Sequence, residues 1–155
     1  MGQSKQFLMV KAAITYPFLD WARAVVQEVV SECIAPELIF DERDASIAQA
    51  IKESLAKSTG ICVALSLPQL QQTNGNRADD TQYICSLCIG VIQNRALSTD
   101  VDGAAVAETL FRTFAGAEYE SGAFRPVDVR ADNLTHSTVG MKKAHEFIIY
   151  TTLTI

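Results

Sequence analysis

The sequence predicts an α+β fold, with a mostly antiparallel sheet of four to five strands and two to three helices packed on one face of it. Two segments, 83–92 and 145–155, are rich in β-branched, aromatic and aliphatic residues, which favour strands. Three others, 18–33, 44–55 and 101–115, repeat apolar residues at helical spacing. Together these segments supply both kinds of element.

The composition is that of one globular domain spanning residues 1–155. Hydrophobic residues make up 48% of the chain and charged residues 20%, which argues against disorder. The net charge of −5 disfavours a dedicated nucleic-acid reader, which needs a basic surface. No apolar run has the roughly 18 residues of a membrane span, and the N-terminal apolar run is too short for a signal peptide. We therefore expect a cytoplasmic protein.

The first helix is expected to begin at Pro17, because a proline in the first turn loses no backbone hydrogen bond. Phe18, Trp21 and Val25 then follow at helical spacing, and Pro36 closes the helix. The residues before Pro17 carry no clear pattern.

A second helix is expected to start at an N-cap on Asp44, to repeat apolar residues from Ile47 and Ile51 onward, and to end at residues 58–60. Residues 37–40, between the two helices, form a candidate short strand.

Residues 61–67 predict a strand with one core face, because large aliphatic residues alternate there with Cys, Ala and Ser. Pro68 ends this strand or marks a sheet edge. The polar segment 71–81 contains the turn dipeptide Asn74-Gly75, and we expect it to form a long loop that projects from the fold.

Residues 83–92 predict the central strand, because the odd-numbered residues are apolar and the even-numbered residues, on the other face, are small or apolar. A helix over 101–115 follows, with Asp100 as its expected N-cap and Gly116 as the residue that ends it.

The last part of the chain predicts two more strands. Residues 126–131 alternate apolar with charged side chains, as a half-exposed strand does, and 132–143 is expected to be a polar loop. Residues 145–155 carry β-prone side chains on both parities. Such a strand either lies inside the sheet or is covered by a neighbouring subunit, and both interpretations remain open.

Cys85 and Cys88 have the spacing of a redox or zinc pair. On a strand, however, residues three apart point to opposite faces, so the two thiols are expected to diverge and to serve packing. Cys33 and Cys62 also lie among apolar residues, and we expect four reduced, buried thiols.

His136 and His145, with Asp128, Asp132 and Glu146 near them in sequence, are candidate metal ligands or bases. Their spacing matches no metal motif, which favours structural or solvated histidines. The chain also lacks a phosphate-binding glycine motif and a nucleophile elbow. We expect no enzyme, with no catalytic residue, no cofactor and no metal.

Four consecutive features of the second half form a recognisable plan. They are the strand 83–93, the alanine-rich helix 103–114, a strand around 127–130, and a glycine-bearing loop followed by the closing strand 146–153. This order resembles the tail-terminator, or tail-completion, proteins of long-tailed bacteriophages and prophages. The first helix and the strand 61–67 fit the same plan.

The resemblance implies a structural virion protein, a homo-oligomer that closes into a ring, commonly a hexamer, at the head-proximal end of the tail tube. Such a ring ends tail-tube polymerisation and joins the tail to the head, so its partners are tail-tube and head-connector proteins. DNA passes through it without sequence recognition, which an acidic lumen favours. No membrane is involved.

Ring closure by head-to-tail contacts gives long polar loops a use. We expect the contacts in the loops 72–80 and 136–143 and on the closing strand. The expected interface residues are Asn74, Asn76, Arg77, Asp79, Asp80, Lys142, Lys143 and Tyr150.

Two other classes of function remain open from the sequence. One is a small cytoplasmic ligand-binding or enzymatic α+β domain that uses Cys85 or His145 in a pocket. The other is a bacterial adaptor unrelated to phage, whose sheet edge docks a strand of a partner protein.

Overall fold

The structure, a computed structural model, describes residues 2–44, 46–56, 60–74, 81–97, 101–119 and 127–154. Within these ranges the chain forms a six-stranded mixed sheet. Five of its strands follow the order β1-β2-β4-β8-β7, and the sixth, β3, pairs with β4. A separate two-stranded sheet joins β5 and β6. The strands are β1 (Ile39–Asp41), β2 (Ile61–Leu65), β3 (Gln69–Asn74), β4 (Thr81–Asn94), β5 (Glu118–Tyr119), β6 (Val127–Asp128), β7 (Arg130–Val139) and β8 (Lys142–Thr154).

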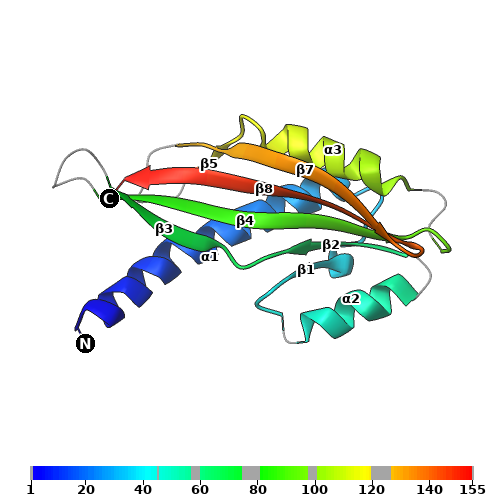
Figure 1. Cartoon of the computed structure of the whole chain (residues 1–155), viewed down its shortest axis with the longest axis horizontal. Coiled ribbons are helices and arrows are strands. Elements are labelled where there is room, and N and C mark those ends of the chain that lie inside the picture. Colours follow the sequence, from blue (N-terminus) through cyan, green and yellow to red (C-terminus); the bar gives the residue numbers. More distant parts are fainter. Residues whose placement is uncertain are drawn as a thin grey trace.

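The described ranges also contain three α-helices, which cover the sheet unequally (Figure 1). The long helix α1 (Gly2–Val30) and α3 (Gly103–Phe114) pack on one face, and the short helix α2 (Ile47–Ala56) packs on the opposite face near β2. A 3-10 turn, Pro36–Leu38, leads into β1. Much of the face opposite α1 and α3 therefore stays open.

Strand β4 is the centre of the sheet. One of its edges pairs with β8 from Gln82 to Asn94, and its other edge pairs with β3 over its first half and with β2 over its second half. Ser66, between β2 and β3, keeps this edge continuous: its N–H donates to Cys88 O at 2.9 Å, and its hydroxyl accepts from Cys88 N–H at 2.8 Å. Strands β2 and β3 are thus two halves of one bent edge.

The main core lies between the odd-numbered side chains of β4 and the helices α1 and α3. Cys85, Leu87, Ile89 and Val91 are all buried there. An aromatic cluster joins the layers and consists of Phe18, Trp21, Phe111, Phe114, Tyr119 and Phe147. Its ring pairs add to the hydrophobic burial that holds both helices on this face.

The fold class predicted from the sequence is confirmed, and the sheet has more strands than the four to five expected. The closing strand β8 lies inside the sheet between β4 and β7, so the first of the two interpretations of its apolar faces holds. Helices α1 and α3 share a face as expected, whereas α2 packs on the other.

Two segments expected to be polar loops are strands at the edges of the sheet. Residues 71–74 belong to β3, and residues 132–139 belong to β7. Both strands pair on only one side, and the described side chains of β7 are mostly exposed. Polar side chains suit an exposed edge strand, which is why composition alone made these segments look like loops.

Several helix boundaries also differ from the expectation. Pro17 lies in the middle of α1, which ends at Val30 rather than near Pro36. The N-cap of α3 is Asp102, whose side chain accepts from Ala104 N–H at 3.0 Å, and Asp100 lies outside the described residues. Asp44 is not the N-cap of α2, because that helix begins only at Ile47, and the Asp44 carboxylate accepts from Asp41 N–H instead. Gly116, with φ +82°, ends α3 as predicted.

A buried carboxylate ties α1 to the edge of the sheet. Asp41, whose side chain is fully buried, accepts from Arg23 of α1 at 2.7 Å and from Arg43 at 3.0 Å. Arg23 also donates to Ile39 O at 2.8 Å. Burial alone raises the pKa of Asp41, but hydrogen bonds from Arg43 and Arg23 and the charge of Arg43 lower it to about 2. The carboxylate therefore stays charged and paired.

We predict that Asp41→Asn lowers the free energy of unfolding by about 3 kcal/mol, because it removes the buried partner of two arginines. Asp20→Asn is the matched control, since Asp20 is 63% exposed and, among the described residues, pairs with Arg43 alone, and it should cost under about 1 kcal/mol. Urea unfolding at neutral pH measures both. Equal effects of the two variants would contradict a central role for Asp41.

The pairing of Asp41 with Arg23 and Arg43 also predicts that the free energy of unfolding decreases in acid. Because the pKa of Asp41 is about 2 in the folded chain and 3.8 without the pairing, its contribution is complete above pH 3.8 and is lost as the pH falls toward 2. As the pH falls between these values, the free energy of unfolding, measured in urea, should decrease less steeply for Asp41→Asn than for the parent chain. Parallel curves would contradict the assignment.

Candidate assembly surfaces

The two closest cysteines point to opposite faces of β4, as the sequence predicted. Cys85 is buried in the main core, and burial raises the pKa of its thiol to about 12. Cys88 lines a groove on the open face instead. Cys33 is exposed just after α1, so the expectation of four buried thiols is wrong for that residue. None of these positions lowers a thiol pKa, which is the condition for a reactive cysteine.

The two histidines, which sequence spacing left apart, meet across the β7–β8 pair. The Nδ1 atoms of His136 and His145 lie 2.7 Å apart, so one ring donates a proton to the other. Burial of His145 lowers its pKa, and the charges of His136 and Lys143 lower it further, while Asp102 acts in the opposite direction. The pair is a structural link between neighbouring strands. Among the described residues, no group of three metal-ligating side chains converges.

The expected interface residues do not form one site. Lys142 and Lys143 open β8, Tyr150 lies further along the same strand, and Asn74 ends β3 on another strand. Asn76, Arg77, Asp79 and Asp80 lie outside the described residues. The segment 136–143 is not a loop: β7 runs to Val139 and β8 starts at Lys142, so only a two-residue turn lies between them.

The described parts of the two regions expected to make contacts lie at opposite ends of the sheet (Figure 1). The connection between β3 and β4 follows the pair Asn74–Thr81. The turn between β7 and β8 is next to the pair Asn94–Lys142, at the other end of β4. The 14 residues of β4 separate the two ends by roughly 40 Å. The expected contact residues Asn74 and Lys142 therefore lie at opposite ends of β4.

The turn between β7 and β8 carries an apolar tip, which sequence reasoning missed. Val139 is 79% exposed, Met141 is 61% exposed, and Leu97, from the turn after β4, is 42% exposed. Arg95 N–H donates to Met141 O at 3.1 Å and ties the two turns together. The signal in the sequence is the pair of large apolar residues on either side of Gly140, whose φ of +61° permits the tight turn.

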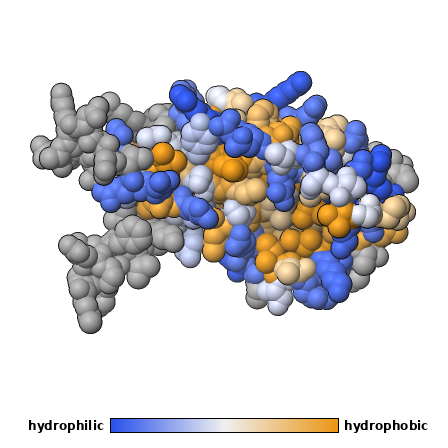
Figure 2. All heavy atoms as spheres, in the orientation of Figure 1, coloured by the Kyte–Doolittle hydropathy of each residue, from blue (hydrophilic) through white to orange (hydrophobic). Residues whose placement is uncertain are grey.

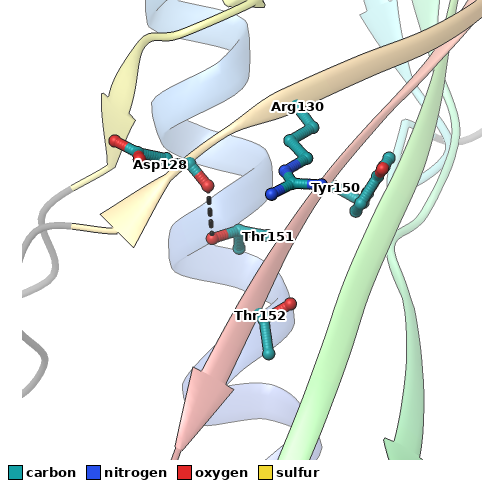
Figure 3. Close-up of a pocket in the computed structure, with 5 residues that line it drawn as sticks. All are labelled: Asp128, Arg130, Tyr150, Thr151 and Thr152. Carbon is teal, nitrogen blue, oxygen red and sulfur yellow. Dashed lines mark hydrogen bonds between the residues drawn. The ribbon is translucent and has the colours of Figure 1, made fainter.

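Tyr150 lines a shallow polar pocket of about 310 Å³ on the open face (Figure 3). Arg130 extends from β7 over β8 beside it, and Thr152 lies further along β8. Asp128 O accepts from the Thr151 hydroxyl at 3.4 Å, and the Tyr150 hydroxyl donates to Asp132 at 3.5 Å. The pocket therefore combines one cation with hydroxyls and carboxylates.

No protein-family model matches the chain, and no curated protein matches it. Among solved structures, the chain is similar to one from the virion of a native gene transfer agent (GTA) particle, with a TM-score of 0.55 and 14% sequence identity. The similarity covers 85% of this chain and 86% of that chain. At this identity the two chains share a fold. Among the described residues, no helix has the length and hydropathy needed to cross a membrane.

We predict that acid weakens the chain through His145. Its pKa in the folded chain lies below the ordinary 6.5, so the unfolded chain takes up the proton more readily and stability falls as the pH drops below 6.5. His145→Gln should remove part of this slope. Urea unfolding at a series of pH values from about 7.5 to 5 measures it.

The control for this prediction is Lys52→Gln, which changes one exposed charge on α2 that is not among the groups acting on the pKa of His145. It should leave the pH dependence of unfolding unchanged. The assignment fails if His145→Gln and the parent chain lose stability in parallel over this range.

Proposed function

We propose that the chain is a structural subunit of a phage-like particle and acts as a tail terminator or head–tail joining ring subunit that ends tail-tube polymerisation. The observation that carries the proposal is the fold, shared over 85% of the chain with a chain from a gene transfer agent virion. The order of elements on which the resemblance to tail terminators depends is present in the structure as β4, α3, β6 and β8.

The placement of the surfaces supports assembly into a ring. Head-to-tail rings need two different contact surfaces on each subunit, because the surface that one copy offers meets a different surface of the next. This chain has an apolar tip at one end of the sheet, and the paired residues Asn74 and Thr81 lie roughly 40 Å away at the other end. A subunit that is long in one direction and different at its two ends suits such a contact.

The chemistry of the described residues supports a structural role over an enzymatic one. The thiol pKa values are raised rather than lowered, and the histidines are bonded to each other. A small enzyme using Cys85 or His145 would need one of these groups free in a pocket, whereas both side chains are buried. The net charge of −5 fits a ring through which DNA passes without being gripped.

Disrupting the gene in a cell that produces the particle tests the proposed role. A tail terminator predicts tails of uncontrolled length and heads without tails, because nothing stops the tube or joins it. Expression of the parent chain from a second locus should restore uniform, joined tails. Particles with normal tails in the disrupted strain would contradict this role.

We predict that the apolar tip contributes to assembly. Val139→Asp combined with Met141→Asp should weaken self-association at least about tenfold, because charges replace two exposed apolar anchors. Leu67→Asp is the matched control, since Leu67 is 37% exposed and lies away from the tip. Light scattering over a concentration series measures the mass, and circular dichroism checks the fold. An unchanged mass for the double variant would exclude the tip as a contact.

A further inference from the structure

A groove runs between α2 and the open face of the sheet, on the side away from the main core. Its volume is about 320 Å³. Figure 2 shows hydrophobic residues gathered on this face between the strands and α2. The apolar lining consists of Ile47, Ala48 and Ile51 on the helix side and Ala64, Cys88 and Ile92 on the sheet side, with Gly90 at the floor.

Small side chains make the groove. Ala64 and Gly90 are opposite each other on β2 and β4, so almost no side chain projects from the sheet beneath α2. A Cβ built at Gly90 would lie 3.4 Å from the nearest atom of Glu146, an ordinary contact, so the glycine is not forced by crowding. The hollow accepts one or two large apolar side chains, and a helix can lie along it.

Two carboxylates make the groove acidic. Glu42 and Glu146 line it, and both are exposed. Burial is the largest cause that raises the pKa of the Cys88 thiol, and the charges of Glu146 and Glu42 raise it further. In the part of the chain that the structure describes, neither carboxylate has an ion-pair partner. An apolar segment that carries positive charge is therefore complementary to the groove.

The N-terminal turns of α1 have that composition. Lys5 and Lys11 are the charged side chains before Asp20, so the segment is purely basic. The same segment contains four consecutive apolar residues, Phe7, Leu8, Met9 and Val10. Its composition is therefore apolar as well as basic.

The helix cannot reach the groove of its own subunit. In Figure 1 the first turns of α1 extend away from the strands, at the β3 end of the sheet. The groove lies on the opposite face and next to the second half of β4, near residues 88–92. A second copy is the partner that supplies a matching groove.

We propose that residues 2–13 of one copy dock into the groove between α2 and the sheet of the next copy. The contact is head-to-tail, because the surface given differs from the surface received, and it repeats around a ring or along a filament. The inference rests on the proposed self-assembly and adds the segment and the surface that carry it.

A charge exchange tests the contact in the full chain. Lys5→Glu with Lys11→Glu should weaken self-association about tenfold, and so should Glu42→Lys with Glu146→Lys, because attraction becomes repulsion. An equimolar mixture of the two double variants should recover association to within about threefold of the parent chain. Glu53→Lys with Glu108→Lys is the matched control, since both residues are exposed and lie outside the groove. Sedimentation velocity measures all four.

The outcomes separate this inference from the proposed function. If the parent chain forms a species of fixed mass and neither reversal weakens it, the docking is wrong while self-assembly stands. A parent chain that stays monomeric at every concentration overturns both. Weakening by both reversals without recovery in the mixture also overturns the docking, because the two charged surfaces then do not meet.

A disulfide test gives the register directly. Met9→Cys, in a Cys33→Ser background that removes the exposed thiol, should form a ladder of covalent oligomers with native Cys88 under mild oxidation. Adding Cys88→Ser should abolish the ladder. A ladder that survives this change, or no ladder from an assembled species, contradicts the placement of the helix in the groove.

Discussion

The pairing of β4 with β8 is the constraint on which the rest of the structure depends. The two strands match residue for residue from Gln82–Thr154 to Asn94–Lys142 without a register shift. A slip by one residue would exchange the faces of β8, turning Phe147 and Ile149 away from the helices and exposing them. The burial of both residues against α1 and α3 therefore fixes the register, and the register places everything attached to either strand.

Three features of the surface follow from that register. The apolar tip forms because β4 and β8 reach the same end of the sheet, which brings Leu97 beside Met141. The histidine pair forms because the hairpin joins β7 to β8, which follows it, and sets His136 opposite His145. The acidic groove forms because Gly90 faces Glu146 across the same pair, on the side that α1 and α3 leave open.

Local patterns predicted the parts of the fold whose two faces differ. The parity of the segment around residues 83–92 predicted both the core face of β4 and the divergence of Cys85 from Cys88, because a strand has a fixed period of two. Gly116 predicted the end of α3 for an equally local reason, because glycine readily adopts the left-handed backbone conformation that ends a helix. These elements need no information from distant residues.

The elements that sequence reasoning missed depend on long-range contacts. Strands β3 and β7 are polar because they lie at edges, and only the partner strand shows that they are strands. Helix α1 continues through Pro17 although the proline removes a hydrogen bond, because Ile14, Phe18 and Leu19 are buried on both sides of it. Of the expected contact residues, Lys142 and Lys143 do lie at one end of the sheet. The groove was not predictable, since its walls come from segments far apart in sequence.

Electron microscopy of the purified chain at high concentration tests the central claim most directly, because it shows shape as well as stoichiometry. The account predicts closed rings of one subunit number with a central opening, each subunit touching its neighbours at two different surfaces. Isolated subunits only, or symmetric dimers joined through one and the same surface, would contradict a ring-forming virion protein.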